Sequence, residues 1–456
     1  MANSPAVAPS AIEASTIRKL RTHILPFVFV LFVINFVDRI NIGFAALTMN
    51  KELAITSQQF GLLSGIFFWG YFIFEIPSNL LLHKLGARIW IARILISWGI
   101  VAILTGFVRT ATHLYLLRFL LGVAEAGFVP GMYLYLMYWF PQRQLAHAIA
   151  LFSSAAPIAS VVGAPTSGVI LDHIHWFGLS SWRWLLILEG IPAIAGGIVT
   201  FFLLPSRPME AKFLTLQEKN YLTAELSVQE QQKIAQQRQR LTVGRALTHA
   251  RVWHLTAAYF TAAIGYNTIN FWMPQLLKAL SSQYSNTMVG ILVTIPFVAA
   301  AIAMIAVSRS SDRALERRYH AAIPVMISAT SLLLLGAFSF SSAFFSIMLW
   351  CVAAAGAWCL FAPFWSMTNE FLSGFSAAAG IAFINSVGNL GGFVGPYAMG
   401  AINRRTGSFR GGLVFAGISL FTSAVLLMAL PRRTGQQVVG GTPILQPSPA
   451  LIPPSV

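Results

Sequence analysis

An apolar run from about Ile24 to Leu47 encloses the polar stretch Asn35-Phe36-Val37-Asp38-Arg39-Ile40-Asn41. As a helix, this run is long enough to cross the roughly 30 Å hydrocarbon core of a bilayer. Ionisable residues inside a transmembrane helix are costly, so they usually face a bundle interior or a water-filled cavity and mark an ion or substrate pathway. The stretch therefore predicts either a transport pathway or a structural ion pair that holds helices together.

Composition places the whole chain among helical membrane proteins. Of its 456 residues, 56% are hydrophobic and 10% are charged, whereas soluble domains are about 25% charged. The net charge of +16 comes from basic residues spread over short polar connections, which is typical of cytoplasmic loops and excludes nucleic acid as a partner. Cys351 and Cys359 share one apolar run, which indicates packing thiols rather than a disulfide framework.

Twelve apolar runs are long enough to span the membrane. A polar segment, residues 205–251, separates an N-terminal six-helix half, residues 1–204, from a C-terminal six-helix half, residues 252–430. The charged residues of this central loop predict amphipathic helical pieces on the membrane surface. Residues 431–456 are rich in Pro, Gly and Gln and predict a disordered cytoplasmic tail. The predicted spans are approximately 24–47, 58–82, 88–108, 112–138, 144–170, 182–204, 253–279, 286–308, 321–340, 343–368, 376–402 and 408–430.

Basic residues predict the orientation. If the N-terminus lies inside, most arginines and lysines fall in cytoplasmic loops, as the positive-inside rule requires. We therefore expect both termini in the cytoplasm and the first run to stay as a signal anchor, since it lacks a small-residue cleavage site. The cluster Arg404, Arg405 and Arg410 falls outside and departs from this rule.

The two halves resemble each other. Asn35 and Asp38 in the first run correspond to Asn267 and Asn270 in the seventh, at the same separation of 232 positions. Gly163 and Gly168 of the fifth run correspond to Gly395 and Gly400 of the eleventh at the same separation, and Pro165 is echoed by Pro396. Two related six-helix halves are typical of secondary transporters, whose site lies near mid-membrane between them. Chance similarity between apolar helices is the alternative.

Four motifs resemble a known family. They are Val37-Asp38-Arg39-Ile40-Asn41-Ile42-Gly43-Phe44-Ala45, Gly70-Tyr71-Phe72-Ile73-Phe74-Glu75-Ile76-Pro77-Ser78-Asn79, Arg118-Phe119-Leu120-Leu121-Gly122-Val123-Ala124-Glu125-Ala126-Gly127 and Asn385-Ser386-Val387-Gly388-Asn389-Leu390-Gly391-Gly392. On these motifs the chain looks like the major facilitator superfamily, and within it the anion:cation symporter family of tartrate-, phthalate-, hydroxyphenylacetate- and galactonate-type permeases. The resemblance extends from about Arg18 to Ala429 and implies an all-α membrane fold of twelve transmembrane helices in two six-helix repeats.

Four charged residues lie near mid-membrane. Arg118 and Glu125 are about two helical turns apart on one face, while Asp38 and Arg39 are adjacent and point about 100° apart. Two acids and two bases can balance to neutrality, and protonation of either acid then frees one positive charge. This behaviour suits a proton-coupled anion carrier. A static ion-pair cluster is the alternative, above all for Arg118.

The resemblance implies a role for each of these residues. Arg39 would clamp the substrate carboxylate, whose two oxygens match the planar guanidinium. Asp38 and Glu125 would carry protons, and Arg118 would be a partner to an acid. Which of the two acids carries the coupling proton stays open.

The C-terminal half offers carboxamides and aromatic rings instead of charges. The positions that correspond to Asp38, Arg118 and Glu125 are Asn270, Trp350 and Ala357. We expect this half to contact the uncharged part of the substrate, with helix packing as the alternative. The candidate residues are Asn270, Asn385, Asn389, Trp358 and Trp365.

Three further polar residues of the N-terminal half have expected roles. Tyr71 can donate a phenolic hydrogen bond to the substrate, or else it packs. Glu75 precedes Pro77, and we expect a structural pair with a basic residue such as Arg93. Glu189 in the sixth run is expected to form a structural pair as well.

Two cytoplasmic loops carry candidate gating charges. The loop that ends at Arg88 has His83 where the superfamily motif usually has an acid, but the corresponding loop keeps Asp312 followed by Arg313. We expect Arg88, Asp312 and Arg313 to lock the cytoplasmic side while the site faces outward.

Together these features predict a proton-coupled symporter, which imports a hydroxy acid, sugar acid or aromatic carboxylate across a bacterial inner membrane by alternating access. We expect a monomer in the lipid bilayer whose partners are a small organic anion and protons. The chain carries no metal-binding spacing, nucleophile elbow or phosphate-binding loop, so we expect neither an enzyme nor a cofactor or metal site. An exporting proton antiporter and a non-transporting membrane sensor are the alternatives, and sodium coupling stays open.

Overall fold

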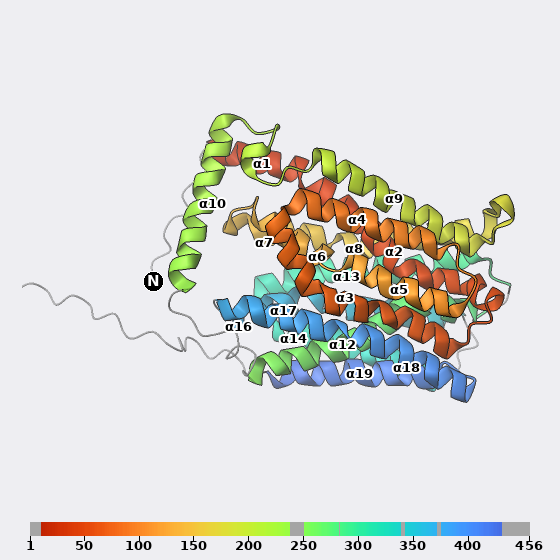
Figure 1. Cartoon of the computed structure of the whole chain (residues 1–456). Helices are drawn as coiled ribbons and strands as arrows, with labels where there is room; N and C mark the ends of the chain where they lie inside the picture. The colour runs from red at the N-terminus through yellow and green to blue at the C-terminus, as the bar shows by residue number, and fades with distance from the viewer. Residues whose placement is uncertain (1–10, 238–249, 282, 339–342, 372–374, 431–456) are drawn as a thin grey trace, which may run out of the picture.

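The computed structural model describes residues 11–237, 250–281, 283–338, 343–371 and 375–430, and its regular elements in these ranges are all helices. Long helices run side by side along the molecule (Figure 1). The predicted tail, 431–456, and residues 238–249 of the central loop lie outside the described residues. The all-α prediction is confirmed.

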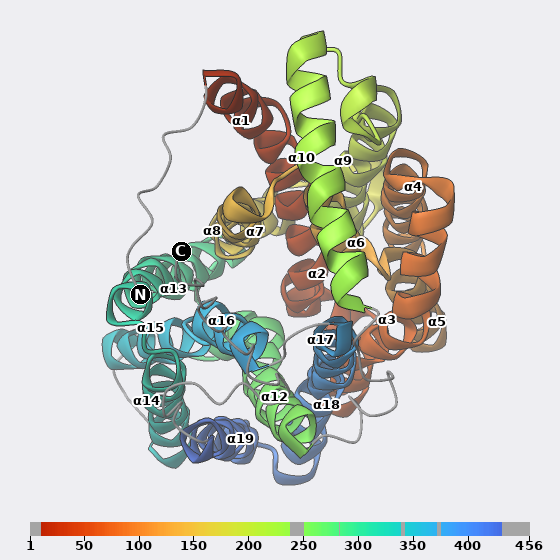
Figure 2. The ribbon, with the colours of Figure 1, turned by 90° about the vertical axis from the view of Figure 1, so that its left-hand side faces the viewer.

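The helices form two groups. The N-terminal helices are α1 (Ala11–His23), α2 (Leu25–Glu52), α3 (Ser57–Leu85), α4 (Ala87–Thr105), α5 (Ala111–Glu125), α6 (Phe128–Met137), α7 (Gln142–Ser153), α8 (Ala155–His173) and α9 (Ser181–Leu203). The C-terminal helices are α12 (Ala250–Lys278), α13 (Asn286–Ala314), α14 (Arg318–Ala337), α15 (Ala343–Trp358), α16 (Phe361–Phe371), α17 (Phe375–Asn389), α18 (Gly391–Thr406) and α19 (Arg410–Ala429). Figure 2 shows the two groups side by side, with α10 (Leu216–Gln237) lying across one end.

Ten helical stretches among the described residues are long and apolar enough to cross a membrane. The two other predicted spans are α12 and the pair α17–α18. Both are helical in the structure, and α12 carries buried polar residues such as Asn267 and Asn270, which lower its hydropathy. The chain is thus a multi-pass membrane protein with a helix, or a pair of helices, at each predicted span.

Several spans are broken near their middle. The span α5–α6 breaks after Glu125, where Gly127 has φ of 85°, and α17–α18 breaks after Asn389. Further breaks separate α7 from α8 and α15 from α16. A broken transmembrane helix is tolerated where neighbouring groups satisfy the freed backbone, and transporters often place such breaks at their site.

Glycines bring α3 and α5 into direct backbone contact. A Cβ atom on Gly122 would lie 2.1 Å from the Phe67 carbonyl oxygen, and one on Gly70 would lie 2.3 Å from that of Phe119. Small residues allow such close approach between membrane helices. As a result, Tyr71 on α3 and Arg118 on α5 belong to one tightly packed unit.

The two groups also meet closely at the end of the molecule opposite α1 and α10, called the far end below. A Cβ atom on Gly290 of α13 would lie 2.4 Å from the Ala164 carbonyl oxygen of α8, and one on Gly400 of α18 would lie 2.2 Å from that of Ser57. Asp172 of α8 accepts hydrogen bonds from the backbone N–H groups of Asn286 (3.1 Å) and Thr287 (2.7 Å) at the start of α13. A carboxylate at a helix N-terminus is favourable, so these contacts close the far end.

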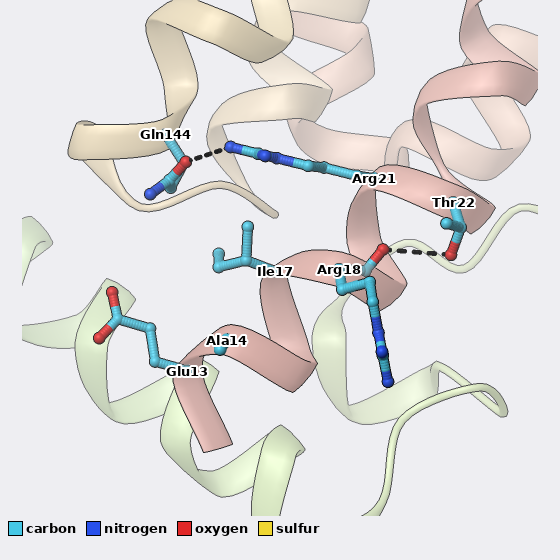
Figure 3. A pocket seen from close by; sticks show the side chains of 7 residues that line it. All are labelled: Glu13, Ala14, Ile17, Arg18, Arg21, Thr22 and Gln144. Carbon is cyan, nitrogen blue, oxygen red and sulfur yellow. Dashed lines mark hydrogen bonds between the residues drawn. The ribbon is translucent and has the colours of Figure 1, made fainter. Parts of the chain in front are cut away.

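At the other end, α1 connects α7 to α10. Arg21 donates to Gln144 of α7 at 2.6 Å, beside a shallow pocket that Glu13 and Ile17 also line (Figure 3). Glu218 of α10 accepts hydrogen bonds from Ser15 (2.8 Å) and Lys19 (2.7 Å) of α1. The central segment is therefore held to the N-terminal helix by polar contacts.

Glu218→Gln is expected to loosen α1 from α10. Burial alone would raise the pKa of Glu218, but hydrogen bonds from Lys19, Thr215 and Ser15 hold that pKa at about 2. This pKa lies below the ordinary value of 4.5. The contact is therefore complete at neutral pH, weakens as pH falls below 4.5, and is lost at about pH 2. Such a pair is worth up to about 1 kcal/mol, so trypsin should cleave α1 up to about fivefold faster in Glu218→Gln at pH 7.

The control for this experiment is Glu225→Gln, which changes a carboxylate on the same helix that accepts from Gln229 and not from α1. Its cleavage rate should match the parent protein. Equal cleavage of Glu218→Gln and Glu225→Gln would contradict the role of Glu218.

Candidate functional site

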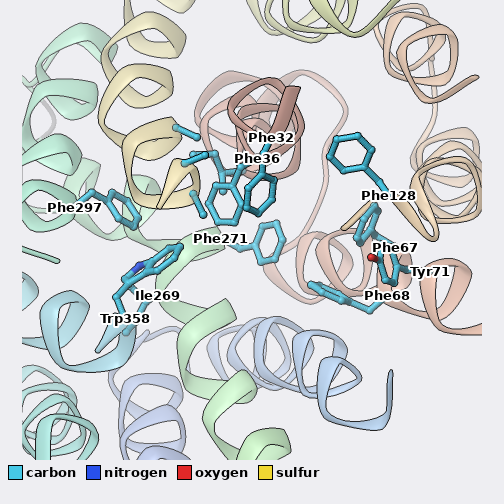
Figure 4. Close-up of a cluster of buried hydrophobic side chains, with 14 of the residues drawn as sticks. Phe32, Phe36, Phe67, Phe68, Tyr71, Phe128, Ile269, Phe271, Phe297 and Trp358 are labelled. Carbon is cyan, nitrogen blue, oxygen red and sulfur yellow. The ribbon is translucent and has the colours of Figure 1, made fainter. Parts of the chain in front are cut away.

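A small cavity lies between the two groups of helices. The predicted residues Arg39, Asn270 and Asn389 share it, although they come from α2, α12 and α17. Its complete lining is Phe36, Arg39, Ile40, Phe68, Tyr266, Asn267, Asn270, Phe271 and Asn389. The cavity therefore combines one cation, three carboxamides and a largely aromatic wall, part of which is drawn in Figure 4.

Arg39 is held by an ion pair and by aromatic rings. Its guanidinium pairs with the carboxylate of Glu125, which is fully buried at the end of α5. Its Cζ atom lies 5.2 Å from the ring centre of Phe67 and 5.5 Å from that of Tyr71. Tyr71 therefore contacts Arg39 through its ring face, a cation–π arrangement that orients the guanidinium.

Arg118 lies near the same rings but has weaker polar contacts. It is 1% exposed, and its Cζ atom lies 5.4 Å from the ring centre of Phe67. Its Nε and Nη2 atoms have no hydrogen-bond partner among the described residues. Phe67 thus contacts both arginines. Phe67 is not among the residues predicted from the sequence, although its position one turn before Tyr71 on α3 indicates the same helix face.

Asp38 is hydrogen-bonded to Asn41 and not to Arg39, although the charges of Glu125, Arg118 and Arg39 act on it. It is 1% exposed, and its Oδ1 atom accepts a hydrogen bond from Asn41 Nδ2 at 3.1 Å. Its Oδ2 atom and both amide atoms of the fully buried Asn35 have no partner within the described ranges. Buried polar atoms are rarely left without partners in proteins, so these atoms are suited to a proton or another exchangeable group.

The expected pair of Glu189 with a basic residue is wrong. Glu189 of α9 is buried and accepts a hydrogen bond from Ser167 Oγ of α8 at 2.8 Å. Asn41 and Asp38 of α2 are its other polar neighbours. It has no ion pair among the described residues, because its helix face meets α2 and α8, where no free basic side chain is in reach.

The expected pair of Glu75 with Arg93 is also wrong. Glu75 accepts hydrogen bonds from Asn385 Nδ2 (2.9 Å) and Ser386 Oγ (2.7 Å) of α17. Arg93 instead stacks on Trp90, with its Cζ atom 3.9 Å from the ring centre. The face of α3 that carries Glu75 meets the C-terminal helices and not the loop. Asn385 is thus a contact between the two groups in this structure.

The two tryptophans occupy different surroundings. Trp358 packs against Tyr266 (ring centres 5.0 Å apart) and Phe36 (5.7 Å), which both line the cavity. Its Nε1 atom is buried and has no partner among the described residues. The ring partners of Trp365 are Tyr259 and Phe364, and none of these three residues lines the cavity.

The predicted gating residues lie at the end that carries α1 and α10. Arg88 donates to the Leu204 carbonyl at 2.6 Å and pairs with Glu210. Asp312 pairs with Arg317, and Arg313 is exposed. These contacts stay within one group of helices, so in this conformation Arg88 and Asp312 do not join the two groups.

Among the residues that the structure describes, no group of three or more His, Cys, Asp or Glu side chains could hold a metal ion. The cavity has the groups to bind an anion at Arg39 in place of the Glu125 carboxylate, and its carboxamide oxygens can accept hydrogen bonds from that anion.

Comparison with known proteins identifies the family. The sequence matches the Major Facilitator Superfamily over residues 28–396 and 255–450. A protein of Agrobacterium vitis named as a tartrate transporter is 44% identical over 432 residues, covering 95% of each chain. The inner membrane transport protein RhmT of Escherichia coli is 34% identical, covering 94% of this chain and 98% of its own.

The fold agrees with this relationship. A partially occluded inward-open structure of the Escherichia coli xylose transporter XylE superposes with a TM-score of 0.73 at 13% identity, covering 93% of this chain and 100% of that one. These relatives are named as transporters, in keeping with a protein that is not an enzyme. The chain belongs to the major facilitator superfamily, among its permeases of the anion:cation symporter type.

Proposed function

We propose that this protein is a proton-coupled symporter that imports a small organic anion across a bacterial inner membrane. The supporting observation is the Arg39–Glu125 ion pair beside a cavity that both groups of helices line. A carboxylate that enters the cavity competes with Glu125 for the guanidinium. Glu125 is then left buried without its cation, and a proton neutralises it, so anion binding and proton binding favour each other.

The orientation of this proposal follows from charge. The end with α1 and α10 carries most of the basic residues, so we place it and both termini in the cytoplasm. The far end then faces the outside and is closed, which makes this conformation the one that releases substrate inward. Alternating access requires the far-end contacts to open and the cytoplasmic ends to approach, with Arg88, Asp312 and Arg313 proposed to lock that state.

The C-terminal wall of the cavity supports a hydroxy acid as the substrate. Asn270 Nδ2 donates to the Tyr266 carbonyl at 2.8 Å, and its Oδ1 atom has no partner among the described residues. This leaves a buried acceptor, which a substrate hydroxyl can satisfy. Asn389 adds a second carboxamide to the same wall. The similarity to a protein named as a tartrate transporter supports this class, since tartrate carries two carboxylates and two hydroxyls.

Uptake into proteoliposomes tests the proposal. Hydroxy acids, sugar acids and aromatic carboxylates are first screened for compounds that raise the melting temperature of the purified protein, because a bound ligand stabilises the folded state. We expect a hydroxy acid to do so, and its uptake to be driven by a pH gradient, inside alkaline. Uptake driven by a sodium gradient instead would contradict proton coupling.

Gly290→Ala is expected to shift the protein toward a conformation that is open at the far end. The new methyl group would lie 2.4 Å from the Ala164 carbonyl oxygen, a rigid backbone atom of the other group of helices. The measurement is maleimide labelling of an introduced cysteine, Asn267→Cys, after replacement of Cys351 and Cys359. A clash of this kind costs about 1 kcal/mol or more, so labelling from the far side should rise at least about fivefold.

Gly411→Ala is the matched control, because among the described residues its methyl group meets only a side-chain atom, Ile402 Cγ2 at 2.8 Å, which belongs to the same group of helices. Its labelling rate should equal that of the parent. If Gly290→Ala also labels at the parent rate, the far-end contact does not control access.

A further inference from the structure

Glu189 adds a further buried acid to the interior of the N-terminal helices. The buried charges there are Asp38, Glu75, Glu125 and Glu189 against Arg39 and Arg118. With every group ionised, four acids and two bases leave two uncompensated negative charges inside the membrane. Uncompensated buried charges are costly, so this interior needs further positive charge.

The geometry shows where that charge is needed. Glu125 has the Arg39 guanidinium as the partner of its Oε1 atom, while its Oε2 atom has no partner among the described residues. Asp38 and Glu189 have hydrogen bonds from Asn41 and Ser167, but Asp38 Oδ2, Glu189 Oε2 and Asn41 Oδ1 have no partner among the described residues. These three oxygen atoms are buried within one small polar cluster. Glu75 lies apart from these atoms, at the contact with Asn385 and Ser386 of α17, so one missing positive charge belongs with Asp38 and Glu189.

No other charged side chain in the surroundings can supply it. Helix α9 packs against α2, α4 and α8. On α4, Arg88 contacts Glu210 and Arg93 stacks on Trp90. Arg183, near the start of α9, pairs with Glu52 at the surface.

The remaining charges lie elsewhere. On α8, Asp172 caps α13 and His173 is exposed. Lys51 of α2 is exposed as well. Arg118 acts on Asp38 through its charge but forms no ion pair with it among the described residues, and it is already counted as one of the two bases.

We propose that Asp38 and Glu189, joined by Asn41, bind one proton at a site separate from the Arg39–Glu125 pair. A hydronium ion of the aqueous phase gives up the proton and becomes water, the proton forms an O–H bond with a carboxylate oxygen of either acid, and one buried negative charge is neutralised. It leaves by the reverse step. No other reactant is needed.

The placement of the cluster also indicates the side from which the proton enters. Ser167, Glu189 and Asp38 lie about 9, 12 and 21 Å from the far ends of their helices, at 1.5 Å per residue. The polar groups thus extend from the level of Asp38 toward the far end, along the packed surfaces of α8, α9 and α2. We therefore place the entry of the proton at the far end. This part of the inference rests on the proposed import function, whereas the proton site does not.

Infrared spectroscopy of the purified protein tests the site directly. At neutral pH exposed carboxyl groups are ionised, so a C=O stretching band of a protonated carboxyl reports a buried acid that holds its proton. We expect this band in the parent protein, and a loss of at least half its intensity in Glu189→Gln. Ser167→Ala removes the hydrogen bond to Glu189 and should shift the band to higher wavenumber without removing it.

Glu52→Gln is the control, since Glu52 is a carboxylate at the far surface that bonds Trp182 and Arg183. Its spectrum should match the parent. The inference is overturned if Glu189→Gln keeps the full band, or if Ser167→Ala leaves its position unchanged. Ser167→Ala decides the matter on its own if Glu189→Gln does not fold.

The spectra need no transport, so the two proposals fail separately. If Glu189→Gln loses the band but a pH gradient does not drive uptake by the parent protein, the proton site stands and the symporter proposal is contradicted. If a pH gradient drives uptake but Glu189→Gln leaves the band unchanged, the symporter proposal stands and the proton site is overturned.

Discussion

Arg39→Lys is expected to abolish uptake of the organic anion while the protein still folds and inserts. The guanidinium of Arg39 pairs with Glu125 and lies over the rings of Phe67 and Tyr71. A lysine keeps the charge, but it is a point charge that cannot bind two carboxylate oxygens side by side or lie flat over a ring. Losing these interactions should cost about 3 kcal/mol, so uptake should fall at least about 100-fold.

The measurement is uptake of the hydroxy acid into proteoliposomes, with gel filtration and melting temperature as checks on folding. Arg93→Lys is the matched control, since Arg93 is also partly buried in the N-terminal helices but stacks on Trp90 away from the cavity. It should transport at close to the parent rate. Normal uptake by Arg39→Lys would remove the clamp role from the proposal.

The course of each helix could be predicted because hydrophobicity and length decide it. The first run was predicted over residues 24–47, and α2 covers Leu25–Glu52. The breaks inside spans could not be predicted in the same way. The turn at Gly127 fits against Ser78 of α3 and depends on a neighbouring helix, a contact that periodicity along one segment does not describe.

Those features of the site that depend on a single helix could be predicted from the sequence. Asp38 and Arg39 are adjacent, so any helix sends them in different directions, and in the structure they have different partners, Asn41 and Glu125. The Glu75 prediction failed because its partners, Asn385 and Ser386, are more than 300 residues away in another group of helices. Such a contact depends on how α3 and α17 are rotated toward each other, and one sequence does not determine this.

Asn385 and Asn389, both predicted to contact the substrate, have different partners in the structure. Asn385 binds Glu75 and contributes to the contact between the two groups, while Asn389, one helical turn later, lines the cavity. A movement of α17 that separates Asn385 from Glu75 must also move Asn389. The substrate wall and the contact between the groups are thus mechanically linked through one short helix.

Glu125→Gln is expected to uncouple transport from the proton gradient. Glutamine has nearly the same shape and can still accept a hydrogen bond from Arg39, but it neither carries a charge nor takes up a proton. Arg39 is then available to the anion at any pH, so exchange of labelled for unlabelled anion should continue. Coupling free energies are typically 1–3 kcal/mol, so accumulation driven by a pH gradient should fall about tenfold or more.

Proton binding and proton coupling are different quantities in this protein, and Glu125→Gln separates them. With Glu125 neutral, the buried acids Asp38, Glu75 and Glu189 still outnumber Arg39 and Arg118, so the site at Asp38 and Glu189 should keep its proton and the infrared band should persist. Because Glu125 is the acid that competes with the substrate for Arg39, its loss removes the link between anion and proton occupancy. A protonophore should therefore no longer change the activity that remains, whereas in Glu52→Gln it should act as in the parent. Continued pH-driven accumulation by Glu125→Gln would show that Asp38 and Glu189 also perform the coupling.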